Sequence, residues 1–157
     1  MPFPKVGNLA PDFSLLNQNN ENIHLKNFHG KNNLLVYFYP KASTPGCTVQ
    51  ACEIRDYYQE FKNLNIVVLG ISPDKPAKLQ KFDVKYNLKF HLLADEDHSV
   101  ADAYGVWGLK KFMGREFMGI LRTSFYIGLD GKLLHIFEKV NTKTHHHDVI
   151  NYIKGFN

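Results

Sequence analysis

Two cysteines, Cys47 and Cys52, are the residues whose type and spacing indicate covalent chemistry. They are the only cysteines among 157 residues, which is too few to staple a small secreted domain with disulfides. The thiolate is the nucleophilic form of cysteine, and an ordinary free thiol is only ~3% ionised at pH 7. A reactive cysteine therefore needs a local structure that favours the thiolate.

The residues before Cys47 predict such a structure. Pro45 suits the first position of a helix, where no N–H is needed, and Thr44 is then the natural N-cap residue. Cys47 would be the third helical residue, close to the free N–H groups and the positive end of the helix dipole. Both features favour the thiolate. The segment also follows a predicted parallel strand, at the edge where α/β sheets bind ligands.

Cys52 lies five residues further along the same predicted helix. In an intact helix the two Cα atoms would be roughly 8.7 Å apart, whereas a disulfide requires about 7 Å or less. The cysteines can therefore bridge only if the first turns unwind, and Gly46 weakens that part of the helix. The other interpretation of Cys52 is an inert, buried small hydrophobic residue. The spacing differs from the Cys-x2-Cys of dithiol oxidoreductases and zinc knuckles.

The surrounding pattern predicts an α/β fold. Two continuous apolar runs, 34–39 and 66–71, are typical of strands buried on both faces. A helical stretch over 45–64 separates them, which makes a βαβ unit with parallel strands. The polar turn 17–22 joins strands around 13–16 and 23–25 into an N-terminal β-hairpin.

The rest of the chain adds helices and strands to this core. Ser72-Pro73-Asp74 reads as a helix start, and Asp130-Gly131 is a strong hairpin turn. The other expected elements are strand 90–94, helix 99–104, strands 121–128 and 132–137, and a closing helix 146–154. We expect a single domain, 1–157, with a central mixed β-sheet flanked by helices.

Composition narrows the class of protein. Hydrophobic residues make up 44% and charged residues 22%, which excludes disorder. The net charge is +4, but only three residues are arginine. The lysines of 75–89 follow one helical face, so we expect a solvated face and no nucleic-acid binding. The apolar runs are too short to span a membrane. No targeting segment is visible, and we expect a cytoplasmic protein with reduced cysteines.

Segment 38–56 resembles the active-site segment of peroxiredoxins, in particular the PrxQ or bacterioferritin comigratory protein subfamily. The Pro-x3-Thr-x2-Cys pattern of that family is present as Pro40, Thr44 and Cys47, and the second cysteine of the subfamily as Cys52. The resemblance extends over nearly the whole chain and implies a thioredoxin-like fold. Its other matching segments are 10–13, 104–108, 111–114 and 119–125, the last of which contains Arg122.

The resemblance implies a thiol peroxidase that reduces hydrogen peroxide and organic hydroperoxides. Cys47 would attack the peroxide and become a sulfenic acid, with Arg122 stabilising the developing charge. Thr44 would position the peroxide, and Pro40 would shield the site. Cys52 would then form a disulfide with Cys47, which thioredoxin would reduce. The resemblance implies no cofactor or metal and favours a monomer.

One residue departs from the family pattern. Many relatives carry Glu three residues after the first cysteine, whereas this chain has Gln50. The amide keeps the ability to form hydrogen bonds but loses the charge, which puts a local ionic network in doubt. Arg55 could also reach the cysteines, although a structural pair with Glu53 or Asp56 is the better expectation.

Histidines and aromatic residues leave further alternatives open. Adjacent residues of a helix point about 100° apart, so we interpret His145-His146-His147 as a helix start rather than a metal site. Trp107 and Phe112 are expected in a loop near the site, either in the core or as an apolar wall or docking surface for a reductant. A non-enzymatic redox switch and a metal-binding structural module are the rival functions.

Overall fold

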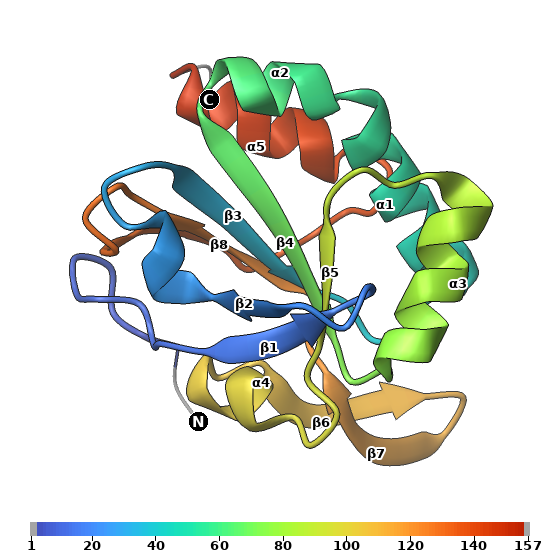
Figure 1. Ribbon diagram of the computed structural model, residues 1–157. Helices are drawn as coiled ribbons and strands as arrows, with labels where there is room; N and C mark the ends of the chain where they lie inside the picture. The colour runs from blue at the N-terminus through green and yellow to red at the C-terminus, as the bar shows by residue number, and fades with distance from the viewer. Residues whose placement is uncertain (1–2, 156–157) are drawn as a thin grey trace.

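A seven-stranded mixed sheet forms the centre of the computed structural model, which describes residues 3–155 (Figure 1). The strand order is β2-β1-β5-β4-β3-β8-β9. Strands β3, β4 and β5 are parallel, and the other neighbouring pairs are antiparallel. These strands are β1 (Ser14–Asn17), β2 (Asn22–His24), β3 (Asn33–Phe38), β4 (Ile66–Ser72), β5 (His91–Ala94), β8 (Thr123–Ile127) and β9 (Leu133–Phe137). The predicted mixed sheet and N-terminal hairpin are confirmed.

Helices cover both faces of the sheet. They are η1 (Leu25–Phe28), α1 (Pro45–Asp56), α2 (Tyr58–Asn63), α3 (Pro76–Tyr86), α4 (Ser99–Ala103) and α5 (His145–Ile153). The buried residues Ile54 of α1, Phe61 of α2, Leu79 of α3 and Val149 of α5 belong to one core cluster. Val100 of α4 belongs to the cluster on the other face. No helix within residues 3–155 is both long and apolar enough to cross a membrane.

Strand β3 separates the two core clusters. Leu35 and Tyr37 point into the cluster with α1 and α5, while Val36 and Phe38 point into the opposite one. Successive side chains of a strand alternate between faces, so the continuous apolar run reflects burial on both sides. Gly70 on β4 leaves room for the Tyr37 ring, because a Cβ there would lie 2.9 Å from it. The packed strand then ends at Phe38, and a short loop leads from it into α1, the helix that contains Cys47.

The predicted helices differ from the structure at two boundaries. The stretch 45–64 is two helices, α1 and α2, separated at Tyr57. Helix α3 begins at Pro76 and not at Pro73. Asp74 is instead a buried loop residue, whose carboxylate accepts a 2.7 Å hydrogen bond from the backbone N–H of Ala42. This bond ties the loop after β4 to the loop before α1.

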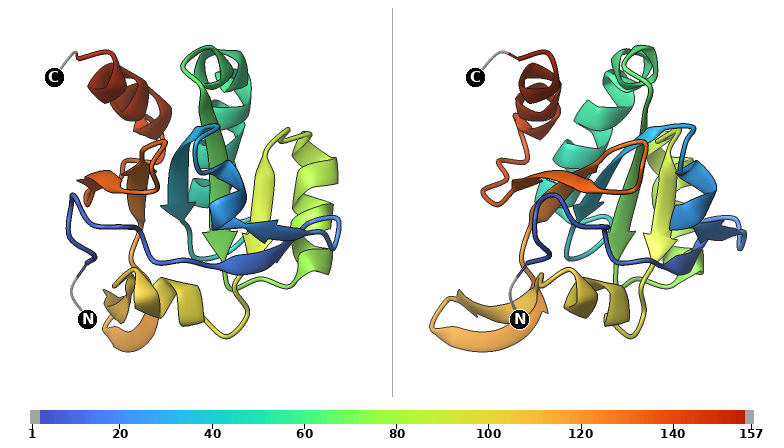
Figure 2. Two further views of the ribbon diagram at one scale, coloured as in Figure 1. Left: turned by 60° about the vertical axis from the view of Figure 1, so that its left-hand side comes forward. Right: turned by 90° about the vertical axis from the view of Figure 1, so that its left-hand side faces the viewer.

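The sequence prediction of a loop around residues 107–112 was wrong. Strands β6 (Trp107–Phe112) and β7 (Arg115–Ile120) form a separate two-stranded sheet. Met113 and Gly114 make the turn, both with positive φ, 52° and 77°, as a two-residue hairpin turn of type I′ requires. Glycine permits this backbone conformation, but methionine is not a usual turn signal. The hairpin extends away from the central sheet (Figure 2).

Candidate active site

Cys47 lies at the third position of α1, as predicted. Pro45 begins the helix, Thr44 is its N-cap residue, and Cys47 is 1% exposed. The Thr44 hydroxyl does not cap the helix, however, since it donates to the carbonyl oxygen of Lys41 at 2.8 Å. Cys47 therefore faces the N-terminal end of a helix that lacks a side-chain cap. That end favours negative charge on the sulfur.

Arg122 directly contacts Cys47. Its Nη2 donates to the Cys47 Sγ at 3.1 Å, and its Nη1 donates to Gln50 Oε1 at 3.0 Å. Arg122 lies one residue before β8 rather than within a strand. Antiparallel pairing places Thr123, the first residue of β8, opposite Phe38, the last residue of β3. The sheet register thus brings Arg122 to the loop that leads into α1.

Gly46 has a second role that its sequence position did not reveal. A Cβ atom at this residue would lie 3.2 Å from Arg122 Nη2 and 3.8 Å from Thr142 Cγ2. The first distance is tighter than ordinary van der Waals contact. The absence of a side chain therefore lets the guanidinium approach the first turn of α1, besides weakening the helix.

Cys52 is half-buried on the same continuous helix, and both cysteines are free. Burial raises the pKa of the Cys52 thiol, and the nearby Arg55 lowers it in part. Arg55 pairs with Asp56 at 2.9 Å and donates to the backbone oxygen of Tyr86 at 2.7 Å. The expected structural pair is confirmed for Asp56, and the structure shows Arg55 in no contact with Cys47.

His145 is the site residue that the sequence did not identify. The histidine run begins α5, as predicted, yet His145 is only 2% exposed and lies behind Gln50. Its Nδ1 is 3.2 Å from Gln50 Nε2, and its Nε2 is 2.7 Å from Ser124 Oγ. In the sequence, the only sign of changed polar contacts near Cys47 was Gln50, which stands where many relatives have Glu. Among residues 3–155, no three His, Cys, Asp or Glu side chains converge as metal ligands.

The structure places the other three residues named from the sequence, Pro40, Trp107 and Phe112, in three different surroundings. Pro40 is half-buried and directly follows Tyr39, which is 1% exposed. Trp107 packs at the edge of the core and stacks on His98, with ring centroids 3.9 Å apart. Phe112 is 66% exposed, near the tip of the β6–β7 hairpin. Phe112 is therefore not a core residue.

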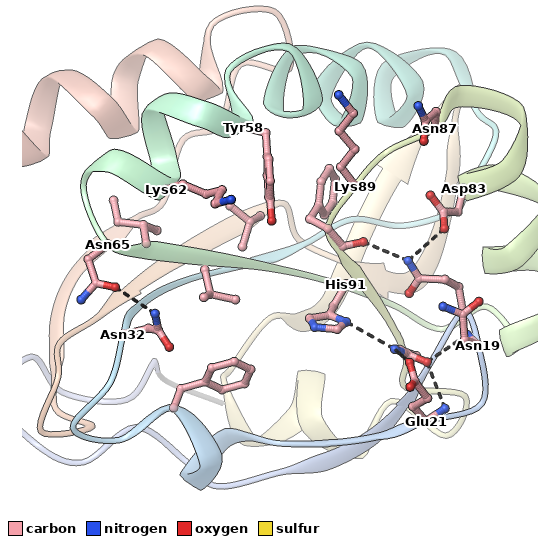
Figure 3. A pocket seen from close by; sticks show the side chains of 17 residues that line it. Asn19, Glu21, Asn32, Tyr58, Lys62, Asn65, Asp83, Asn87, Lys89 and His91 are labelled. Atoms are coloured by element: carbon pink, nitrogen blue, oxygen red, sulfur yellow. Dashed lines mark hydrogen bonds between the residues drawn. The ribbon is translucent and has the colours of Figure 1, made fainter.

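A pocket of about 600 Å³ lies elsewhere, between the β1–β2 end of the sheet, α2 and α3 (Figure 3). Neither cysteine lines it. Many of its polar side chains bond to one another, as when Asn32 donates to Asn65 at 2.8 Å and Gln18 donates to Asp83 at 3.2 Å. A ligand site usually has polar groups that converge on a ligand. The cysteine site therefore remains the better candidate for chemistry.

Comparison with known proteins agrees with this geometry. Residues 6–136 match the AhpC/TSA family. The chain is 53% identical to peroxiredoxin Bcp of Escherichia coli strain K12 over 150 residues, 96% of each chain. It is 42% identical to peroxiredoxin Bcp of Bacillus subtilis strain 168 over 150 residues, 96% of this chain and 95% of that one.

A solved structure shows the same fold. The bacterioferritin comigratory protein of Xanthomonas campestris, studied for its alkyl peroxide reduction, superposes with a TM-score of 0.85 at 28% identity. The alignment covers 91% of this chain and 90% of that one. A thioredoxin-like fold with a buried, arginine-bound cysteine at a helix N-terminus defines a thiol peroxidase. The chain belongs to the AhpC/TSA family and, within it, to the Bcp/PrxQ peroxiredoxins.

Proposed function

We propose that Cys47 is the peroxidatic cysteine, and that it reduces alkyl hydroperoxides and hydrogen peroxide. The contact of Arg122 Nη2 with the Cys47 sulfur is the observation that carries this assignment. The thiolate attacks one peroxide oxygen, the O–O bond breaks, and the sulfur becomes a sulfenic acid. The leaving oxygen takes a proton and departs as alcohol or water. Arg122 stabilises both the thiolate and the charge that develops on the leaving oxygen.

Thr44 and Pro40 complete the proposed peroxide site. The Thr44 hydroxyl donates its hydrogen to the Lys41 oxygen, so its own oxygen is left to accept a hydrogen bond from the peroxide O–H. Pro40 lies in the loop before α1 and has no N–H to bind water. Both residues belong to segment 40–44, which leads directly into the first turn of α1.

Cys52 is the proposed resolving cysteine. Its thiolate attacks the sulfenic sulfur, which releases water and forms the Cys47–Cys52 disulfide. The helix must first unwind, because an intact helix holds the Cα atoms roughly 8.7 Å apart. Two features of α1 favour local opening: Thr44 gives no side-chain cap, and Gly46 has low helix propensity. Local unfolding of this kind draws on the least stable segments of a protein.

Thioredoxin, or a similar dithiol protein, is the proposed reductant. The β6–β7 hairpin exposes Leu109, Phe112, Met113, Phe117 and Met118, an apolar surface that a protein partner can cover. The base of the hairpin adjoins the cysteine site, since β7 ends at Ile120, two residues before the Arg122 that contacts the Cys47 sulfur. One chain holds every proposed site residue, which supports a monomer. A disulfide that must be reduced in each cycle supports a cytoplasmic location.

Peroxide consumption with thioredoxin tests the assignment. Cys47→Ser should abolish it, and Cys52→Ser should stop after a single oxidation. Mass spectrometry after one equivalent of peroxide should show the loss of two hydrogens, confined to a Cys47–Cys52 linked peptide. Turnover in the Cys47→Ser protein would refute the peroxidatic assignment. A wild-type protein that reacts once and stops would instead indicate a redox switch.

A further inference from the structure

Behind Arg122, a line of side chains leads away from Cys47 into the core. Arg122 Nη1 contacts Gln50 Oε1 at 3.0 Å, Gln50 Nε2 faces His145 Nδ1 at 3.2 Å, and His145 Nε2 faces Ser124 Oγ at 2.7 Å. Gln50, His145 and Ser124 are 1%, 2% and 0% exposed. They come from α1, α5 and β8, so three separate elements meet behind the guanidinium.

The chemistry of the donors fixes the direction of each hydrogen bond. A guanidinium can only donate, so the Gln50 atom that faces Arg122 must be the carbonyl oxygen. The amide nitrogen of Gln50 then faces His145, and because it too can only donate, His145 Nδ1 must accept. The ring proton is therefore on Nε2, from which it donates to Ser124 Oγ. Every donor in this line of side chains therefore faces an acceptor only when His145 is neutral.

The surroundings of His145 favour this neutral form. Burial, together with the neighbouring His146 and Arg122, lowers the pKa of His145 to about 3. The ring packs against Tyr37, with centroids 5.7 Å apart. Among the described residues 3–155 no carboxylate forms an ion pair with this ring, and the nearby Glu53 pairs with His146 at 3.4 Å.

We propose that His145 is a positioning residue for the peroxidase reaction: it holds the Gln50 amide so that its oxygen faces Arg122, and thereby holds Arg122 against Cys47. The inference rests on the proposed roles of Cys47 and Arg122. The terminal torsion of a glutamine side chain has a broad, roughly two-fold preference. Without an acceptor at His145 Nδ1 the amide is free to turn over, which would place its NH2 group against the guanidinium. A donor is effective in catalysis when its orientation is set before the reaction.

The same argument accounts for the departure of Gln50 from the family pattern. A glutamate at this position has no N–H to give to a neutral His145, so its carboxylate would face the ring lone pair. That arrangement is stable only if Nδ1 gains a proton. Gln50 therefore matches the His145 tautomer that carries its proton on Nε2, and the substitution Gln50→Glu should place a proton on Nδ1, either by a change of tautomer or by protonation of the ring.

Two substitutions of His145 separate positioning from packing. His145→Asn places an amide near the position of Nδ1, where its oxygen can accept from Gln50, whereas His145→Phe keeps a ring without nitrogen. The readouts are the rate of Cys47 oxidation by hydrogen peroxide in a single turnover and the pH profile of Cys47 alkylation by iodoacetamide. We expect His145→Phe to slow oxidation about tenfold and to move the alkylation profile to higher pH, as loss of an oriented donor would. The oxidation rate of His145→Asn should stay within about threefold of the wild-type rate.

Val149→Ala, at another fully buried position of α5, controls for structural damage. It should lower the melting temperature but leave the alkylation profile in place. Ser124→Ala tests the line independently of the ring, and we expect an intermediate loss of rate. The inference fails if His145→Phe matches wild type in both readouts, or if a folded His145→Asn is as impaired as His145→Phe. It also fails if Val149→Ala shifts the profile equally. Wild-type protein that does not oxidise Cys47 at all would instead refute the proposed function.

Discussion

Arg122 Nη2 lies 3.1 Å from Cys47 Sγ, although 75 residues separate the two along the chain. The antiparallel register of β3 and β8 produces this contact, because it pairs Phe38 with Thr123 at the edge where α1 begins. A cation and a helix N-terminus therefore converge on one buried sulfur. Both stabilise negative charge there.

Loss of the Arg122 guanidinium should impair peroxide reduction strongly. Removal of one oriented donor typically costs about 10²–10³ in rate, and we expect Arg122→Leu to lose this much in the oxidation of Cys47. Arg122→Lys keeps the charge but lacks the planar fork whose two nitrogens contact the sulfur and Gln50 separately, so its loss should be intermediate. Stopped-flow oxidation by hydrogen peroxide measures both. Lys31→Leu, at an exposed cation remote from the site, is the control, and a wild-type rate for Arg122→Leu would contradict the prediction.

Gly46→Ala should slow oxidation while it stabilises α1. The added Cβ would lie 3.2 Å from Arg122 Nη2, so the guanidinium must move. Alanine also gains about 1 kcal/mol over glycine in a helix interior, which opposes the unwinding needed for the disulfide. Separate measurement of sulfenic acid formation and of disulfide formation should show both steps slowed. Faster disulfide formation would argue against helix unwinding as a requirement.

Cys52 should be the slower thiol in the reduced protein. Burial raises the pKa of Cys52, so at pH 7 less of it is thiolate than in an exposed cysteine. We expect iodoacetamide to label Cys47 well before Cys52, and peptide mapping at short times checks the order. In 6 M urea the two rates should become similar. Preferential labelling of Cys52 in the native protein would contradict this account.

Acid should destabilise the protein through His145. The pKa of His145 falls from an ordinary 6.5 to about 3 on folding, so below pH 6.5 the unfolded chain binds a proton that the folded chain does not. The free energy of unfolding therefore decreases as the pH is lowered. This residue alone should lower it by about 2 kcal/mol between pH 7 and pH 5. Urea unfolding at the two pH values measures the loss. His145→Asn should reduce the difference by that amount, whereas His24→Asn, at an exposed position, should not.

The exposed hairpin should contribute to reductant binding. Phe112 and Met113 are 66% and 86% exposed near its tip. The double substitution Phe112→Ser and Met113→Ser should raise the KM for thioredoxin several-fold, because exposed apolar side chains supply much of the area that a partner buries. Val84→Ser, a change of a 76% exposed residue on α3, is the matched control. An equal effect of the control, or an unchanged KM in the double variant, would exclude the hairpin as the docking surface.

Local sequence determined much of the fold and the positions of the two cysteines on α1. The alternation of β3 into two clusters, the turn at Asp130-Gly131, and the helix start at Pro45 follow from periodicity and backbone preferences over a few residues. The same short-range rules place Cys47 in the first turn of α1 and Cys52 too far away to bridge. The β6–β7 hairpin was missed because Met113 is an unusual residue at a left-handed turn position.

Only the tertiary structure decided what surrounds the sulfur. Arg122 reaches Cys47 through the pairing of β3 with β8, and His145 reaches Gln50 because α5 packs beside α1. Contacts of this kind depend on sheet register and on the close packing of distant elements, which no local pattern encodes. For the same reason, the sequence showed Gln50 as a lost charge, whereas the structure places its amide between His145 and the arginine that contacts Cys47.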